Sequence, residues 1–186
     1  MSTQVSKRLF TVEEYHRMAK AGILSEDDRV ELIEGEIVEM PPIGSQHASC
    51  VNRLNRLFSQ CVGERAIVSV QNPIYLSEYS EPQPDLALLR PCTDFYAQAH
   101  PQPQDILLVV EVADTSLTYD REVKIPLYAQ SGIPEVWLVD LTANCIEAYR
   151  KPSPQGYQEI KQFQRDQNLF PQAFPDVGLT VQDILG

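Results

Sequence analysis

The chain has 186 residues and a mass of 21.0 kDa, and its 15 basic and 26 acidic residues give a formal net charge of −11. With 43% hydrophobic residues, a chain of this length can bury a core of its own, so we expect one globular domain spanning residues 1–186. The acidic balance argues against tight, nonspecific binding of nucleic acid phosphates, but not against an enzyme whose site binds a divalent cation or that needs a protein partner to deliver its substrate.

The N-terminal segment, residues 1–15, contains no apolar stretch of the kind found in secretory signal peptides. No part of the chain reaches the roughly 18 to 20 apolar residues of a membrane span. We therefore expect a cytoplasmic protein with no membrane partner. The cytosol would keep the cysteines reduced, and their scattered spacing does not predict a zinc site. They are Cys50, Cys61, Cys92 and Cys145.

A first helix is predicted from Val12 to Lys20. Thr11 and Glu14 form a capping-box pattern before it, and Gly22 follows its end. Segment 29–40 then alternates in residue type around a Glu-Gly pair, which predicts two antiparallel strands joined by a tight turn.

A second helix is predicted from Ser45, which can cap its N-terminus. Its apolar residues recur at spacings of three and four, so one face of the helix should pack on a sheet. These residues are Ala48, Val51, Leu54, Leu57, Phe58 and Cys61. Three short strands should follow, within residues 66–70, 73–77 and 85–89, and residues 99–104 read as a surface loop.

The central strand is predicted at residues 106–112, whose continuous apolar run indicates burial on both faces. A helix should follow and end at Gly132, and Pro126 predicts a kink or an early break within it. Segments 136–141 and 145–150 predict a hairpin, and a short helix is expected near residues 181–185. Together the elements predict an α/β (α+β) fold, with a mixed sheet flanked by helices and an extra N-terminal helix and hairpin.

Two carboxylates stand out within this pattern. Asp85 opens one apolar run, and Glu111 lies near the end of the central strand, where an unpaired ionised carboxylate would cost several kcal/mol. If the two strands are neighbours, both carboxylates can reach one end of the sheet, where they would suit Mg²⁺ or Mn²⁺. Such a metal would polarise a phosphate and activate its bound water. The alternatives are a turn residue after Pro84 and a strand-end residue in a salt bridge.

Lys124 and His47 are the other candidates for a site. On the predicted third helix, Lys124 could orient a water molecule or neutralise charge on a reacting phosphate. It could equally form a surface pair with Asp120, four residues earlier. His47 lies in the first turn of the second helix, where the helix dipole disfavours protonation. It could bind metal or help handle phosphate, or it could be a polar surface residue.

Further charged residues permit two interpretations. Glu31 and Glu34, in the predicted first hairpin, could add carboxylates to a metal site, although the solvent face of such a hairpin is usually charged. Arg53 and Arg56 could contact a nucleic acid backbone from the polar side of the second helix, but a solvated helix face explains them as well. The chain has no glycine pattern typical of nucleotide-binding loops.

Several blocks of the chain, taken together, resemble the bacterial Uma-type restriction endonuclease family, a branch of the PD-(D/E)XK nuclease superfamily. The blocks are VELIEGEI with the following His47, Pro84-Asp85, VVEVADTS at 109–116, YDREVK at 119–124 and YAQSGIPEVWLVD at 128–140. The resemblance covers about Phe10 to Leu185. It implies a restriction-endonuclease-like core of four or five strands, with Asp85 and Glu111 as ligands of Mg²⁺ or Mn²⁺.

The resemblance also implies a catalytic lysine, and here the chain departs from the superfamily. The lysine usually lies two residues after the acidic ligand, but that position is Ala113. Lys124, within the Asp-x-x-x-Lys block, is the candidate for this role. The implied activity is Mg²⁺-dependent hydrolysis of DNA, with Asp85, Glu111, Lys124 and His47 as catalytic residues.

Two other functions remain open at the level of sequence. The net charge of −11 and the absent lysine at position 113 fit a noncatalytic interaction module on a decayed nuclease fold. Metal-assisted hydrolysis of a small phosphorylated substrate would fit the acidic surface. For a nuclease we expect a homodimer, because double-strand cleavage is commonly achieved by two symmetric sites.

Overall fold

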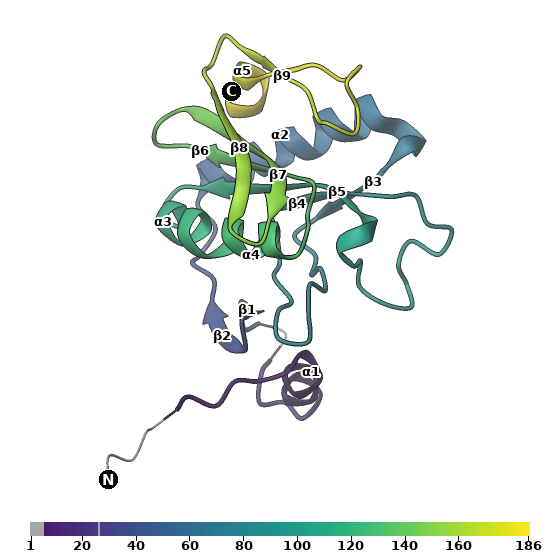
Figure 1. The fold of residues 1–186 in the computed structure, drawn as a ribbon, viewed down its shortest axis with the longest axis vertical. Coiled ribbons are helices and arrows are strands. Elements are labelled where there is room, and N and C mark those ends of the chain that lie inside the picture. The colour runs from purple at the N-terminus through teal and green to yellow at the C-terminus, as the bar shows by residue number, and fades with distance from the viewer. Residues whose placement is uncertain (1–5, 26) are drawn as a thin grey trace.

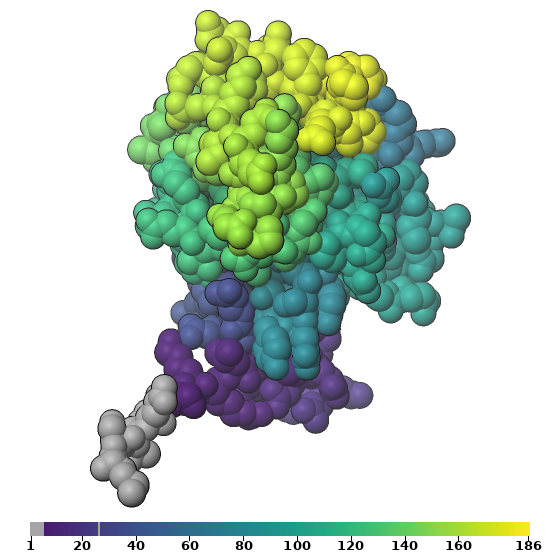
Figure 2. Space-filling view, in the orientation of Figure 1, coloured from purple at the N-terminus to yellow at the C-terminus, as the bar shows by residue number. Residues whose placement is uncertain are grey.

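The computed structural model of the protein describes residues 6–25 and 27–186. The first five residues, which belong to the segment expected to lack a signal peptide, lie outside these ranges. Within them, one six-stranded sheet forms the centre of the molecule, and helices cover both of its faces (Figure 1). A unit made of α1 (Val12–Lys20), β1 (Val30–Ile33) and β2 (Glu36–Glu39) lies below this body (Figure 2).

The central sheet has the strand order β3-β4-β5-β6-β7-β8. Its strands are β3 (Ile67–Val70), β4 (Leu86–Leu89), β5 (Ile106–Ala113), β6 (Glu135–Asp140), β7 (Cys145–Ser153) and β8 (Gly156–Phe163). Strands β5 and β6 pair in parallel, and the other neighbouring strands pair antiparallel. Because parallel neighbours need a crossover connection, the chain between β5 and β6 leaves the sheet and forms helices over one face.

Each face of the sheet packs against helices to form an apolar core. On one face lie α2 (Ser45–Val62) and α5 (Val181–Leu185), where the rings of Phe58 and Trp137 are 5.7 Å apart between centroids. On the other lie α3 (Leu117–Tyr119), the π-helical turn η3 (Asp120–Lys124) and α4 (Ile125–Gln130). Shorter elements are η1 (Gly63–Arg65), η2 (Pro103–Asp105), β9 (Asn168–Leu169) and β10 (Leu179–Thr180). Strands β5 and β6 are therefore buried on both sides, which explains their continuous apolar runs.

The structure confirms most of the predicted elements. The capping box of α1 is formed: the Thr11 side chain accepts a hydrogen bond from Glu14 N, and the Glu14 side chain accepts one from Thr11 N. The N-terminal hairpin, the buried central strand, the β6–β7 hairpin and the last helix lie where the sequence predicts them. The mixed sheet flanked by helices, with an added N-terminal helix and hairpin, is thus confirmed as the fold class.

Three predictions about the strands and helices are wrong. Segment 73–77 is not a strand, because its backbone N–H groups bond to scattered loop carbonyls, such as those of Pro82 and Pro101, rather than to a ladder. Strand β8, the edge strand that completes a sheet of six strands in the described part of the chain, was not predicted. Ser45 is the first residue of α2 and not its cap, which is Gly44.

Details of two helices also differ from expectation. In α2, Val51, Leu54 and Phe58 of the predicted apolar face are buried, but Cys61 is exposed, and Cys50, which was not assigned to that face, is buried. Pro126 does not break its helix. Instead the wide π turn η3 comes directly before it, and the helix continues to Gln130. No helix among the described residues is both long and apolar enough to cross a membrane.

Candidate functional site

The two predicted carboxylates meet at one end of the central sheet. Continuing the β4–β5 pairing by one residue brings Asp85 opposite Glu111, and the Asp85 backbone nitrogen lies 3.4 Å from Glu111 Oε2. A cavity of about 500 Å³ opens here, and Glu31, His47 and Lys124 also line it. The structure therefore brings together four candidates chosen from the sequence, together with one carboxylate of the first hairpin.

Asp85 is held by three neighbours. Its Oδ2 accepts a hydrogen bond from Val112 N at 2.9 Å and lies 3.0 Å from His47 Nε2, and its Oδ1 accepts one from Gln71 Nε2 at 3.3 Å. The contact with Asp85 raises the pKa of His47, although burial opposes this. This contact acts against the helix dipole, which was expected to disfavour protonation of His47.

His47 also has an unused nitrogen. Its Nδ1 is buried and has no hydrogen-bond partner among the described residues. A buried polar atom without a partner is costly, so it marks a position where a bound molecule could be contacted.

Glu111 is the more deeply buried of the two carboxylates, with 3% of its surface exposed. Its Oε1 accepts a hydrogen bond of 2.6 Å from the Tyr128 hydroxyl and lies 3.0 Å from Lys124 Nζ. Burial raises the pKa of Glu111 to about 8, and the nearby Lys124 only partly offsets this effect. Glu111 therefore also forms the salt bridge that the alternative interpretation described for a strand-end residue. Its partner is Lys124.

Lys124 is not the surface residue of the alternative interpretation. It is 5% exposed, and its Nζ lies between Glu111 Oε1 at 3.0 Å and Glu31 Oε2 at 3.2 Å. Burial alone would lower the pKa of Lys124, but these two carboxylates and Asp120 raise it above its usual value. Lys124 is therefore a charged ammonium in the wall of the cavity.

The remaining sequence candidates divide into one that joins the site and three that do not. Glu31 is buried on β1 and also accepts a hydrogen bond of 3.0 Å from Gln83 N. Glu34 occupies the exposed hairpin turn, away from the cavity. Arg53 donates a hydrogen bond of 2.8 Å to the Leu185 carbonyl and so ties α2 to α5. Arg56 is exposed outside the cavity.

Sequence reasoning missed several residues of the site. Asp120, considered only as a surface partner, is buried, lines the cavity and accepts a 2.6 Å hydrogen bond from the Ser116 hydroxyl. Burial raises the pKa of Asp120. Tyr128, which holds Glu111, lies four residues after Lys124 and could have been found from that spacing. Gln71 reaches the site from a loop, and nothing in the sequence signals its position.

The chemistry of these side chains fits a hard divalent cation. Carboxylate oxygens are the ligands that Mg²⁺ and Mn²⁺ prefer, and Mg²⁺ keeps several water ligands, so two carboxylates suffice on the protein side. Six acidic residues line the cavity, against two permanent cations, Arg29 and Lys124, and the imidazole of His47. The acidic residues are Glu31, Glu39, Asp85, Glu111, Asp114 and Asp120. A cation at Asp85 and Glu111 would compensate this excess of acidic groups.

Comparison with known proteins identifies the family and the fold of the chain. Residues 12–182 match the family model Uma2, described as "Putative restriction endonuclease". A solved structure from Anabaena variabilis ATCC 29413, titled as a putative nuclease belonging to DUF820, aligns with a TM-score of 0.75 and 17% sequence identity, covering 95% of this chain and 97% of that one. At this identity the likeness establishes a shared fold. No curated protein matches the chain.

Proposed function

The chain belongs to the Uma2 family of restriction endonuclease-like proteins, and from this premise we propose that it is a Mg²⁺-dependent endonuclease that hydrolyses phosphodiester bonds in DNA. Family and fold both support a nuclease. The observation that carries the proposal is the cluster of Asp85, Glu111 and Lys124 at the wall of one cavity, in which Glu111 and Lys124 are buried.

In this proposal Asp85 and Glu111 hold the metal ion, Mg²⁺ or Mn²⁺. When bound, the ion would polarise the scissile phosphate and lower the pKa of a water molecule. Asp85 is oriented for this role by Val112 N and His47, and Glu111 by the Tyr128 hydroxyl. These hydrogen bonds fix the ligand oxygens before the ion arrives, which reduces the reorganisation that binding requires.

Lys124 takes the role of the superfamily lysine. The usual position is Ala113, a fully buried residue that belongs to the same apolar core as Ile125 and Tyr128. Lys124 reaches Glu111 from the helical crossover instead, so its ammonium can orient the attacking water or neutralise charge on the phosphate. His47, with its raised pKa and unpartnered Nδ1, can donate to a phosphate oxygen.

At the level of the assembly, we propose one nuclease domain over residues 1–186 and a cytoplasmic homodimer. Cleavage of both strands of a duplex needs two sites, and a two-fold dimer supplies them with one kind of interface. Because the net charge of −11 repels DNA, we also propose a partner protein that delivers the DNA to the dimer.

The test is a time course on supercoiled plasmid and on single-stranded DNA at low salt, with Mg²⁺, Mn²⁺ or EDTA. The wild type should cleave only with metal, and Glu111→Gln and Lys124→Ala should lose at least roughly 100-fold in rate, since each removes a group that acts on the transition state. Glu122→Gln is the matched control, because Glu122 is exposed on the same π turn.

Two results would overturn the proposal. A folded Glu111→Gln variant with unchanged cleavage would remove Glu111 from the mechanism. Absence of cleavage by every form, with no Mn²⁺ binding by isothermal titration, would favour the noncatalytic interaction module, which Ala113 and the net charge of −11 also fit.

A further inference from the structure

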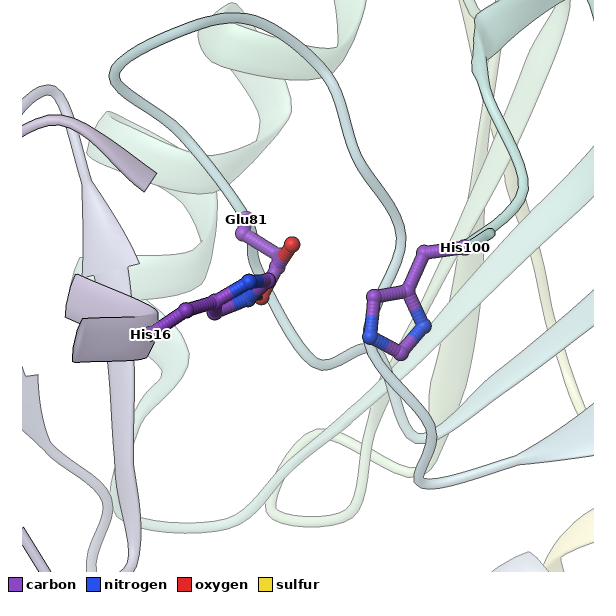
Figure 3. Close-up of side chains that lie close together, drawn as sticks. All are labelled: His16, Glu81 and His100. Atoms are coloured by element: carbon purple, nitrogen blue, oxygen red, sulfur yellow. Dashed lines mark hydrogen bonds and ion pairs between the residues drawn. The ribbon is translucent and has the colours of Figure 1, made fainter. Parts of the chain in front are cut away.

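A second group of metal-ligating side chains lies outside the proposed active site. His16 on α1, Glu81 between β3 and β4, and His100 between β4 and β5 each present a ligand atom, and these atoms lie within 4.8 Å of one another (Figure 3). None of the three lines the cavity at Asp85 and Glu111. They line a separate cavity of about 700 Å³.

Glu81 carries the strongest indication of a ligand. It is 4% exposed, and its Oε1 lies 2.7 Å from His16 Nε2. Its other oxygen, Oε2, is buried and has no hydrogen-bond partner among the described residues. An unsatisfied carboxylate oxygen is expensive to bury. A bound ion or an ordered water molecule would satisfy it.

The two imidazoles approach Glu81 from different sides (Figure 3). Their rings lie edge to face, with centroids 6.2 Å apart. His16 and His100 are both exposed, so either ring can turn without disturbing the core. Tetrahedral sites with bonds of roughly 2.0 to 2.2 Å separate their ligand atoms by roughly 3.3 Å, so small side-chain rotations would close the site.

The backbone of all three segments is already fixed. Val12 N at the start of α1 bonds to the Glu78 carbonyl at 2.8 Å, and Glu81 N bonds to the Leu32 carbonyl at 2.8 Å. Next to His100, the Pro101 carbonyl accepts from Tyr75 N at 2.9 Å. The backbone segments that carry the three side chains are thus held by contacts that do not depend on a metal.

We propose that His16, Glu81 and His100 bind a divalent transition metal ion of the Zn²⁺ class. Two imidazoles and one carboxylate suit Zn²⁺, whereas Mg²⁺ prefers oxygen ligands alone. The ion would join α1 to the two long loops on either side of β4, and so attach the N-terminal unit to the body of the molecule. A fourth ligand would come from water in the adjoining cavity. This site is independent of the proposed nuclease function.

The test measures Zn²⁺ affinity of untagged, reduced protein by competition with a chromophoric chelator in the presence of excess Mg²⁺. His16→Asn, His100→Asn and Glu81→Gln should each weaken binding at least roughly tenfold, as loss of even indirect support for a metal does. The double variant Cys61→Ser/Cys92→Ser is the control, because a thiol on the surface could bind Zn²⁺ adventitiously.

Two further readouts test the structural role. At a free Zn²⁺ concentration of about 100 times Kd, the melting temperature should rise by about 5 to 10 °C. Amide hydrogen exchange should slow in residues 12–20, and this protection should vanish in His16→Asn and His100→Asn. Unchanged Zn²⁺ affinity in both histidine variants, or its loss in the cysteine double variant, would overturn the proposal.

Discussion

Lys124 serves two buried carboxylates at once, and its removal should cost more stability than the removal of either partner. Without it, Glu111 and Glu31 share a buried space with no cation. We expect Lys124→Met to lower the free energy of unfolding by about 3 kcal/mol, the cost of leaving a buried charge uncompensated. Urea unfolding of the variant and the wild type in EDTA measures this difference in the free energy of unfolding.

Glu111→Gln provides the comparison for Lys124→Met. It should be less destabilising, because Lys124 keeps its ion pair with Glu31. If Glu111→Gln proved the more damaging of the two, the ion pair with Glu31 would not be contributing.

Removal of the Tyr128 hydroxyl, which contacts Glu111, should lower stability by a smaller amount. Tyr128→Phe removes the 2.6 Å hydrogen bond to Glu111 Oε1 while keeping the buried ring. Because one oxygen of a buried carboxylate loses its donor, we expect a loss of about 1 to 2 kcal/mol in the free energy of unfolding. The exposed control Glu122→Gln should stay within about 0.5 kcal/mol of the wild type.

How far these residues can be predicted from the sequence depends on their context. Glu111 stands out because an acidic residue interrupts a fully apolar strand, and Asp85 because it opens the neighbouring one. The raised pKa of His47 could not be predicted, because it depends on a carboxylate 38 positions away in the chain. The contact of Gln71 with Asp85 depends on a loop conformation that no local pattern encodes.

The π turn η3 sets the direction from which Lys124 enters the site. Asp120 and Lys124 both line the cavity, and Ile125 N bonds to the Asp120 carbonyl, five residues back. Pro126 favours this widened turn, because its ring clashes with the carbonyl four residues earlier in a regular helix. We expect Pro126→Ala to let the segment tighten into an α-helix, leaving stability equal or higher while lowering cleavage at least roughly tenfold through misplacement of Lys124.

Plasmid cleavage and thermal unfolding of Pro126→Ala together test this interpretation. Full activity in the variant would mean that the π turn does not position the lysine. A loss of both activity and stability would mean that the variant damages the packing of α4 instead.

Strand β8 is joined to the turn between α4 and β6 by a tyrosine, which makes this contact sensitive to alkaline pH. The Tyr157 hydroxyl donates a 2.7 Å hydrogen bond to the Ile133 carbonyl, and burial raises the pKa of Tyr157 well above its usual value. Since the folded state holds the proton more tightly, the stabilisation is complete below about pH 10, the unfolded pKa, and is lost as pH rises toward the folded value.

Urea unfolding at neutral and strongly alkaline pH measures this dependence. The Tyr157→Phe variant should lose less stability than the wild type over the same range, because the ionising group is gone. An identical loss would assign the alkaline sensitivity to other buried tyrosines, such as Tyr128, whose pKa burial also raises.

At the scale of elements, the strands that the sequence predicts well are those with apolar residues on both faces. Strand β8 lacks this signal because it is the edge of the sheet, with polar residues such as Gln158 and Lys161 exposed. Segment 73–77, in contrast, has the apolar pattern of a strand but does not form one. Its Ile74 and Leu76 are buried like strand residues, but nearby prolines leave no partner with which to form a ladder.

For the whole molecule, the net charge of −11 predicts that DNA binding depends on divalent cations. In EDTA at physiological salt, we expect a dissociation constant weaker than about 10⁻⁴ M, the weak end of nonspecific binding. Calcium should strengthen binding, because it neutralises the carboxylates around Asp85 and Glu111. The acidic residues on the rest of the surface keep their charge. Fluorescence anisotropy with a labelled duplex measures both states, and tight binding in EDTA would contradict the prediction.

The contacts that build the cavity join segments that leave the ribosome at very different times. Glu31 on β1 meets Lys124 in the crossover between β5 and β6, which is synthesised long after β1. A chain still being translated, or one cut short before this crossover, therefore lacks the ammonium in the wall of the cavity. Under the proposed function, such incomplete copies would lack one of the catalytic residues and should not cleave DNA.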